Sequence, residues 1–245
     1  MEHKEYKRII PNSDVAILFI HGIIGTPNHF SRFVSLLPPT ISVHNLLLDG
    51  HGKSAKDFAK TSMQKWEEQV SAALETLSYG HKKIFVVAHS MGTLFAIEQA
   101  VKNQKISGLF LLAVPLRLSI KFKMIRNTLK VHFDRIHPND YEALAAQRCY
   151  GITKDRNLFH YIGWIPRYLE LFAKIRHTRK ILEQLKTECL AYQSINDEIV
   201  SKRSIECLKS NPHIAVNELS ASGHYFYDES DWEFLLHEFE KMLKR

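Results

Sequence analysis

Ser90 lies where an apolar run of the chain breaks into a turn. Residues 84–92 read IFVVAHSMG, which predicts a buried strand that ends just before the serine. In a nucleophile elbow, a serine occupies a strained turn between a strand and a helix, and small residues two places before and after it let the two elements approach closely. Ala88 and Gly92 meet this requirement. The pattern favours Ser90 as a nucleophile over an ordinary turn that contains a serine.

A helix is expected directly after this serine. Its apolar face would consist of Leu94, Phe95, Ile97 and Val101, which recur at helical spacing. The first N–H groups of a helix have no partner within the helix, and its dipole places partial positive charge at that end. We therefore expect the N–H of Met91 to stabilise a negatively charged oxygen that forms on a substrate carbonyl.

A second donor to the same oxygen is expected after the first buried strand. Residues 15–20 read VAILFI, and HGIIGTP follows in residues 21–27. Gly22 and Gly25 would let the main chain come close to the substrate carbonyl, because they carry no side chain. The N–H of Ile23 is then the expected second donor of an oxyanion hole.

An acid and a base are expected beyond two later strands. Residues 188–193 read ECLAYQ and lead into a loop that contains Asp197, the predicted acid. The neighbouring Glu198 is the alternative acid. Residues 213–219 read HIAVNEL and run into a turn-rich loop that holds His224, the predicted base. The chain order of serine, acid and histidine is the order found in α/β-hydrolase triads.

The chain resembles α/β-hydrolases of the bacterial carboxylesterase and monoacylglycerol lipase type over nearly its whole length. The motifs that carry the resemblance are HGIIG at residues 21–25, DGHGKS at 49–54, AHSMG at 88–92, DEIV at 197–200 and SGH at 222–224. Two residues depart from the family pattern. Ala88 replaces the commoner glycine of the elbow, and Ile23 replaces the usual aromatic residue beside the oxyanion hole. The second departure bears on the shape of the acyl pocket.

The resemblance implies a serine hydrolase that cleaves carboxylic esters of short-to-medium acyl chains, or monoacylglycerols, through an acyl-enzyme. Ser90 would attack the carbonyl, His224 would move the proton, and Asp197 would orient the imidazole. No metal or organic cofactor is required. The same residues would also support a thioesterase, a serine aminopeptidase or an acyltransferase. A non-enzymatic ligand-binding protein is the opposing class, and the intact motifs argue against it.

The remaining elements predict an α/β-hydrolase fold, with a mainly parallel central sheet and helices on both faces. Strands expected at residues 41–48 and 108–114 alternate with amphipathic helices, which is typical of parallel sheets. Two helices are expected to begin at capping boxes, Thr61 with Gln64 and Ser230 with Glu233.

A basic insertion interrupts this alternation. We expect residues 115–186 to form a helical cap, and residues 1–114 and 187–245 to form the core. The insertion holds 15 lysines and arginines and 6 acids, so it accounts for more than the whole net charge of +7 and leaves the core about neutral. The residues expected to bind substrate are Ile24, Met124, Ile125, Phe159 and Trp164.

The interleaved apolar and basic residues of the insertion predict transient contact with an anionic membrane surface. A solvated helical face is the alternative. Nucleic acid is not an expected partner, because no nucleic-acid-binding motif accompanies the charge.

The composition is that of an ordinary globular protein. A length of 245 residues, 45% of them hydrophobic and 24% charged, suits one α/β domain with an insertion. The 3 cysteines form no disulfide framework or metal-ligand pair, and no signal peptide is apparent, so a cytoplasmic location is expected. His21, His51 and His89 lie inside the motifs and are expected to orient the backbone rather than to transfer protons.

Overall fold

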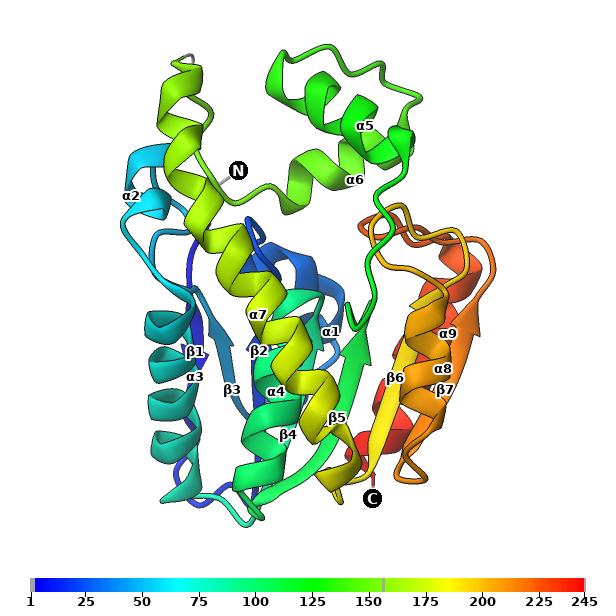
Figure 1. The fold of residues 1–245 in the computed structure, drawn as a ribbon. Coiled ribbons are helices and arrows are strands. Elements are labelled where there is room, and N and C mark those ends of the chain that lie inside the picture. Colours follow the sequence, from blue (N-terminus) through cyan, green and yellow to red (C-terminus); the bar gives the residue numbers. More distant parts are fainter. Residues whose placement is uncertain (1–2, 156, 245) are drawn as a thin grey trace.

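Seven strands form one sheet in the order β1-β3-β2-β4-β5-β6-β7 (Figure 1). The computed structural model describes residues 3–155 and 157–244. The strands are β1 (Tyr6–Arg8), β2 (Val15–Ile20), β3 (Ser42–Leu46), β4 (Lys83–His89), β5 (Ile106–Leu112), β6 (Cys189–Ser194) and β7 (Ile214–Leu219). Among the strands of the described residues, only β1 runs antiparallel to its neighbour, at one edge of the sheet. The predicted α/β class with a mainly parallel sheet is confirmed.

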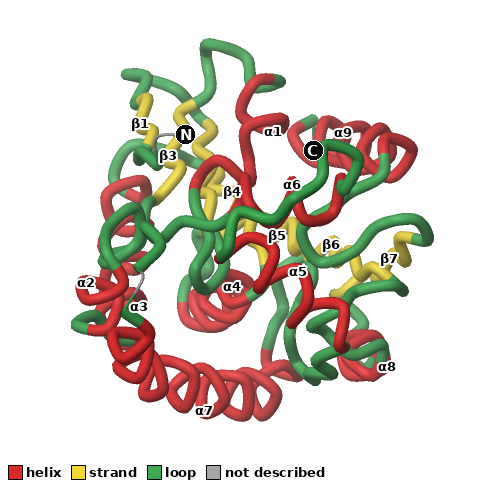
Figure 2. Tube along the Cα trace, turned by 90° about the horizontal axis from the view of Figure 1, so that it is seen from above, coloured by secondary structure: helices red, strands yellow, loops and turns green. Residues whose placement is uncertain are grey.

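The central strands are apolar on both faces because helices cover both (Figure 2). One face is covered by α3 (Met63–Ser78), α4 (Met91–Lys102) and α7 (Ile165–Ile181), and the other by α1 (Ser31–Ser35) and α9 (Glu229–Leu243). A separate hydrophobic cluster lies on each face. The shorter helices are η1 (Pro27–Phe30), α2 (Ala55–Ala59), η3 (Leu182–Gln184) and α8 (Arg203–Lys209).

Two helices begin at residues other than the predicted caps. The hydroxyl of Ser62 caps α3 by accepting the N–H of Lys65 at 3.1 Å. The carboxylate of Asp228 caps α9 by accepting the N–H of Ser230 at 3.0 Å. The predicted caps at Thr61 and Ser230 are therefore wrong by one and two residues. Neighbouring residues of the capping type compete for this position, and the backbone geometry decides between them.

The insertion at residues 115–186 has two parts. Helices α5 (Phe122–His132) and α6 (Tyr141–Cys149), which we call the cap helices, lie above the carboxyl ends of the strands (Figure 1). A 3-10 helix, η2 (Leu158–Trp164), then leads into α7, which runs along α4. Leu171 and Ile175 of α7 belong to the same hydrophobic cluster as the buried faces of α3 and α4. Helix α7, although it is part of the insertion, thus belongs to the layer of helices that covers one face of the sheet.

A buried ion network fastens α7 to the sheet domain. The ammonium of Lys174, a side chain only 9% exposed, lies 2.6 Å from a carboxylate oxygen of Glu98 on α4 and 2.6 Å from one of Glu67 on α3. The hydroxyl of Thr178 donates to the other carboxylate oxygen of Glu98 at 2.8 Å. Partners for both oxygens of Glu98 satisfy a carboxylate that would be costly to bury alone.

Candidate active site

Ser90 occupies the turn between β4 and α4 with φ 52° and ψ −125°. Residues other than glycine rarely adopt a positive φ, so the surrounding structure must hold the backbone there. The N–H of Ser90 donates to the carbonyl of Leu112 at 2.9 Å. A Cβ on Gly92 would lie 2.2 Å from the carbonyl oxygen of Ile20, so glycine is required for α4 to approach β2. The turn has the strained backbone that the sequence pattern predicts.

The structure brings Ser90, Asp197 and His224 together at the carboxyl ends of β4, β6 and β7. His224 Nε2 lies 3.1 Å from Ser90 Oγ, and His224 Nδ1 lies 2.9 Å from Asp197 Oδ2. Because a carboxylate only accepts hydrogen bonds, Nδ1 donates its proton and Nε2 is free to accept the serine proton. The three side chains are buried, with Ser90 7% exposed and His224 1%.

The electrostatics of this arrangement favour a charged histidine–aspartate pair. Burial disfavours protonated His224, but the charge and hydrogen bond of Asp197, together with the charge of Glu198, raise the pKa of His224 above its ordinary value. Burial alone would raise the pKa of Asp197. The charge and hydrogen bond of His224 and the main-chain N–H groups of Val200 and Ile199 lower that pKa instead. Asp197 is therefore a carboxylate at neutral pH and can stabilise an imidazolium.

Glu198 contacts the main chain of His224 and not its ring. One of its carboxylate oxygens accepts the His224 N–H at 2.9 Å. A Cβ on Gly223 would lie 2.8 Å from the same oxygen, so the glycine allows this close approach. The sequence predicts Glu198 only as the alternative acid and does not reveal this contact, because nothing in it distinguishes a bond to the ring from a bond to the backbone.

The loop that carries Ile23 packs directly against Ser90. A Cβ on Gly22 would lie 2.9 Å from Ser90 Cβ, and the N–H of Gly25 donates to the Gly22 carbonyl at 3.0 Å in a tight turn. Ile24 has φ 51°, a rare conformation for a β-branched residue. Met91, the other expected donor residue, is fully buried at the start of α4. The loop of Ile23 and the N-terminus of α4 therefore both adjoin Ser90.

Three motif histidines contact backbone groups around the site. His21 Nδ1 lies 2.9 Å from the carbonyl of Gly22, and its Nε2 accepts the N–H of Leu48 at 3.1 Å. His89 Nε2 donates to the carbonyl of His224 at 2.9 Å, and His51 Nδ1 lies 3.2 Å from the carbonyl of Leu48. Burial lowers the pKa of His21 to about 4 and holds those of His51 and His89 well below the ordinary value. At neutral pH these rings are uncharged.

His29 lies against the same cluster. Its ring centroid is 3.9 Å from that of His89, and its Nδ1 lies 3.2 Å from the sulfur of Cys149 on α6. Burial, followed by the neighbouring charges of His224 and His21, lowers the pKa of His29 to about 3. The sequence singled out neither residue, since nothing in their spacing relates His29 to a cysteine 120 residues away.

The residues expected to bind substrate differ widely in exposure. Ile24 is partly buried against the hydrophobic cluster, and Met124 is half-buried on α5. Ile125 and Phe159 are 46% and 78% exposed. Trp164 is buried, and its indole N–H donates to the carbonyl of Ala55 at 2.9 Å, which ties η2 to α2.

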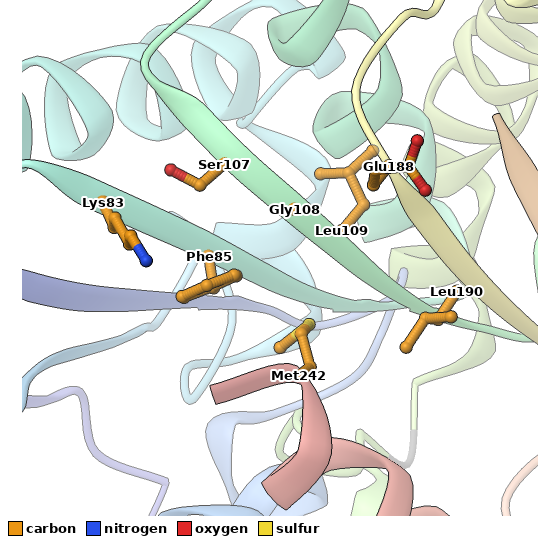
Figure 3. Close-up of a pocket in the computed structure, with 8 residues that line it drawn as sticks. All are labelled: Lys83, Phe85, Ser107, Gly108, Leu109, Glu188, Leu190 and Met242. Atoms are coloured by element: carbon orange, nitrogen blue, oxygen red, sulfur yellow. The ribbon is translucent and has the colours of Figure 1, made fainter. Parts of the chain in front are cut away.

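A hollow of about 230 Å³ lies at the opposite end of the sheet from these residues (Figure 3). Phe85, Gly108, Leu190 and Met242 surround it, between the first halves of β4, β5 and β6 and the end of α9. Its walls are mainly apolar, and it lies away from Ser90, which follows the other end of β4. The hollow is therefore separate from the triad.

Within the described part of the chain, no group of three or more histidine, cysteine, aspartate or glutamate side chains is arranged to hold a metal ion. No helix among residues 3–155 and 157–244 is both long enough and apolar enough to cross a lipid bilayer.

The arrangement of serine, acid and histidine after the parallel strands β4, β6 and β7, together with the glycine-rich loop after β2, defines the α/β-hydrolase class. A family model described as "Serine aminopeptidase, S33" matches residues 11–220. The chain belongs to this family of hydrolases. No curated protein sequence matches the chain.

Solved structures share this fold across the full length of the chain. A structure reported with the metagenome-derived lipolytic enzymes LipS and LipT has a TM-score of 0.74 at 16% identity, and covers 100% of this chain and 98% of its own. The monoacylglycerol lipase of Paleococcus ferrophilus has a TM-score of 0.71 at 19% identity, with coverage of 100% and 99%. An E-2-(acetamidomethylene)succinate hydrolase has a TM-score of 0.67 at 16% identity, with coverage of 99% and 100%.

Proposed function

We propose that the protein is a serine hydrolase that cleaves carboxylic esters of short-to-medium acyl chains, or monoacylglycerols, through an acyl-enzyme. The observation that carries the proposal is the position of His224, within hydrogen-bond distance of both Ser90 Oγ, at 3.1 Å, and Asp197 Oδ2, at 2.9 Å. A buried imidazole between a hydroxyl and a carboxylate is the arrangement that activates a serine for attack on a carbonyl.

In the proposed reaction, Ser90 Oγ attacks the ester carbonyl while His224 Nε2 takes the hydroxyl proton. Asp197 holds the imidazole tautomer and stabilises the imidazolium that forms. The main-chain N–H groups of Ile23 and Met91 stabilise the oxyanion of the tetrahedral intermediate. His224 then protonates the leaving alcohol. Water, deprotonated by His224, releases the acid from Ser90 and completes the cycle.

The surroundings of the triad support an uncharged, apolar acyl group. Ile24, Met124 and Trp164 are proposed to form the wall of the acyl pocket, and Ile125 and Phe159 to meet the substrate at the outer surface. Amide, thioester and acyl-transfer chemistry use the same triad. The family description names aminopeptidases, so aminoacyl amides belong in any substrate test.

The direct test is labelling of the protein with a fluorophosphonate probe, together with hydrolysis of nitrophenyl esters of increasing acyl length, a monoacylglycerol and aminoacyl amides. Ser90→Ala should remove labelling and lower ester turnover by about 10⁴-fold or more. Ser35→Ala, an exposed serine on α1, is the matched control and should leave both unchanged. Normal turnover in Ser90→Ala contradicts the proposal, and faster cleavage of the amides than of the esters moves it to an aminopeptidase.

We also propose transient contact with an anionic membrane surface through the cap helices. Phe122, Ile125 and Leu129 recur along α5 at helical spacing and are 79%, 46% and 51% exposed. Lys121 and Arg126 are exposed beside them, so this surface combines apolar and positively charged groups. Such a combination suits a bilayer whose headgroups carry negative charge.

Flotation with phosphatidylserine vesicles tests this contact. Reversing Lys121 and Arg126 to glutamate should weaken binding, while hydrolysis of a soluble neutral ester stays within a few-fold. The same reversal at Lys82 and Lys105, near the opposite end of the sheet, is the charge-matched control. Absence of vesicle binding by the unaltered protein identifies the basic surface as a solvated face.

Separately, we propose a reducing, cytoplasmic location, which the three free cysteines support.

A further inference from the structure

A short segment after the cap helices lies between two loops of the active site. The N–H of Gly151 donates to the carbonyl of Ile24 at 2.7 Å, and the carbonyl of Gly151 accepts the N–H of Gly52 at 2.6 Å. Two residues later, the N–H of Thr153 donates to the carbonyl of Lys53 at 2.8 Å. We call residues 151–153 the latch segment. It joins the loop of Ile23 and Ile24 to the loop at residues 49–54.

Three glycines connect this segment to the nucleophile by direct backbone packing. A Cβ on Gly151 would lie 2.0 Å from the carbonyl oxygen of Gly25, and a Cβ on Gly25 would lie 2.8 Å from that of Gly22. A Cβ on Gly22 would in turn lie 2.9 Å from Ser90 Cβ. Each contact is closer than a side chain allows. A side chain at Gly151 would therefore have to displace the Gly25 backbone, which packs beside Gly22 and so close to Ser90.

The latch segment also contacts Ile24, a residue with a strained backbone. Ile24 has φ 51°, and a β-branched residue keeps such a conformation only where neighbouring contacts determine it. The hydrogen bond from Gly151 to the Ile24 carbonyl is such a contact. The orientation of this carbonyl is coupled to the backbone of the preceding residue, Ile23, whose N–H is the proposed oxyanion donor.

We propose that Gly151 is a positioning residue of the oxyanion hole, which it sets by holding the Ile24 backbone against Gly25 and Gly22. The inference rests on the proposed function, since it assigns a role within that reaction. In this role, Gly151 lets the insertion contribute to stabilisation of the transition state as well as to the wall of the acyl pocket.

The test is Gly151→Ala, assayed with a small soluble ester such as nitrophenyl acetate. The added methyl group has to push the Gly25 carbonyl away and so moves the loop of Ile23. Loss of a single oxyanion donor costs about 10²–10³-fold in turnover, so displacement of one should lower kcat by about 10–100-fold. KM should change less than about three-fold, because ground-state binding makes little use of the hole. Affinity for a trifluoromethyl ketone, which forms a tetrahedral adduct with the serine, should fall in parallel with kcat.

Two control variants separate this effect from general damage. Gly80→Ala adds the same methyl group at a glycine with nothing within 4 Å, and should leave kcat unchanged. Glu142→Gln removes the ion pair between Lys123 and Glu142, which joins the two cap helices, without touching the latch segment. If Glu142→Gln lowers kcat as much as Gly151→Ala does, loosening of the cap explains the loss and the proposal is wrong.

Thr153→Pro keeps the test decisive if Gly151→Ala does not fold. It removes the N–H that donates to Lys53 and leaves Gly151 and Gly25 unsubstituted, so kcat should fall several-fold with KM unchanged. An unaltered kcat in a folded Gly151→Ala or Thr153→Pro protein overturns the positioning role. Failure of the unaltered protein to hydrolyse esters and to label at Ser90 is a different result, because it overturns the proposed function itself.

Discussion

The carboxylate of Glu198 holds the main-chain N–H of His224 at 2.9 Å, while the adjacent carboxylate of Asp197 holds the ring of the same histidine. Two consecutive acids thus bind different parts of the same catalytic base, one its main chain and the other its ring. Glu198 fixes the loop and adds negative charge near the imidazole, and Asp197 sets the tautomer. Substitutions at the two positions should therefore have different kinetic signatures.

Asp197→Asn should lower kcat on the order of 10⁴-fold, because an amide at this position can donate to Nδ1 and so favours the wrong tautomer. Glu198→Gln keeps an oxygen that accepts the His224 N–H, so kcat should stay within a few-fold. Its loss of negative charge should lower the pKa that governs the acid limb of kcat/KM. Steady-state kinetics between pH 4 and 9 measure both effects. The reverse ranking of the two variants assigns the catalytic acid to Glu198.

The pH dependence of the unaltered protein follows from the raised pKa of His224. The base must be neutral to accept the serine proton, so kcat/KM should rise with pH through a pKa above 6.5 and then level off. His224→Ala should be inactive across this range. A rate that is flat from pH 4 to neutrality, or an active His224→Ala protein, contradicts the assignment of the base.

Lys174→Met should destabilise the fold by about 3–5 kcal/mol, because it leaves the buried carboxylate of Glu98 without its cation. Urea unfolding measures this loss. A second substitution, Glu98→Gln, should restore part of the stability by removing the uncompensated charge. Lys102→Met is the control, since its side chain is 57% exposed and its ion pair with Glu67 should contribute less than about 1 kcal/mol. A Lys174→Met protein as stable as the control shows that α7 does not depend on the network.

His29→Phe should make the protein less sensitive to acid. The pKa of His29 is about 3 when folded and near 6.5 when unfolded, so the unfolded chain takes up a proton that the folded protein refuses. This neutral histidine stabilises the fold above pH 6.5, and its contribution is lost as the pH falls. Between pH 7 and 5 the loss is about 2 kcal/mol.

Phenylalanine keeps an aromatic ring against His89, and the Nε2 that it removes has no hydrogen-bond partner among the described residues. Unfolding free energies at pH 7 and pH 5 should therefore differ less in His29→Phe than in the unaltered protein. The exposed His177→Gln should keep the original difference. An equal pH dependence in all three proteins would place the acid sensitivity at other groups.

The sequence was most informative where the sheet is buried on both sides. Apolar runs predict the buried central strands β2, β4 and β5, and the mixed runs at β3, β6 and β7 complete the six parallel strands. Motifs at the strand ends predict the roles of Ser90, Asp197 and His224. The strand β1 was missed because its three residues, Tyr6–Arg8, are polar and pair only at an edge. Such a strand depends on its neighbour for stability and leaves little trace in hydrophobic periodicity.

Other features depend on tertiary contacts that residue types do not reveal. The basic composition of residues 115–186 predicts cations that face water or a membrane surface, yet Lys174 is buried on α7. A lysine looks the same in a sequence whether it faces water or an internal carboxylate. The contact between Gly151 and Gly25 is a backbone contact, which leaves no side-chain pattern beyond the glycines themselves.

The segment that holds the cap helices, residues 122–149, is anchored at both ends, and this has a consequence for recombination between relatives. At its first end, Leu118 bridges to Val200 beside the acid, and the N–H of Lys121 donates to the carbonyl of Glu198 at 2.9 Å. At its second end, Gly151 begins the latch segment. Residues 122–149 can accordingly be exchanged as a module. Both junctions then lie between Lys121 and Gly151, so the anchoring hydrogen bonds of these two residues are kept. A chimera whose second junction falls after Gly151 places the donor's backbone beside Gly25. Such a chimera would have the donor's substrate range but a lower turnover.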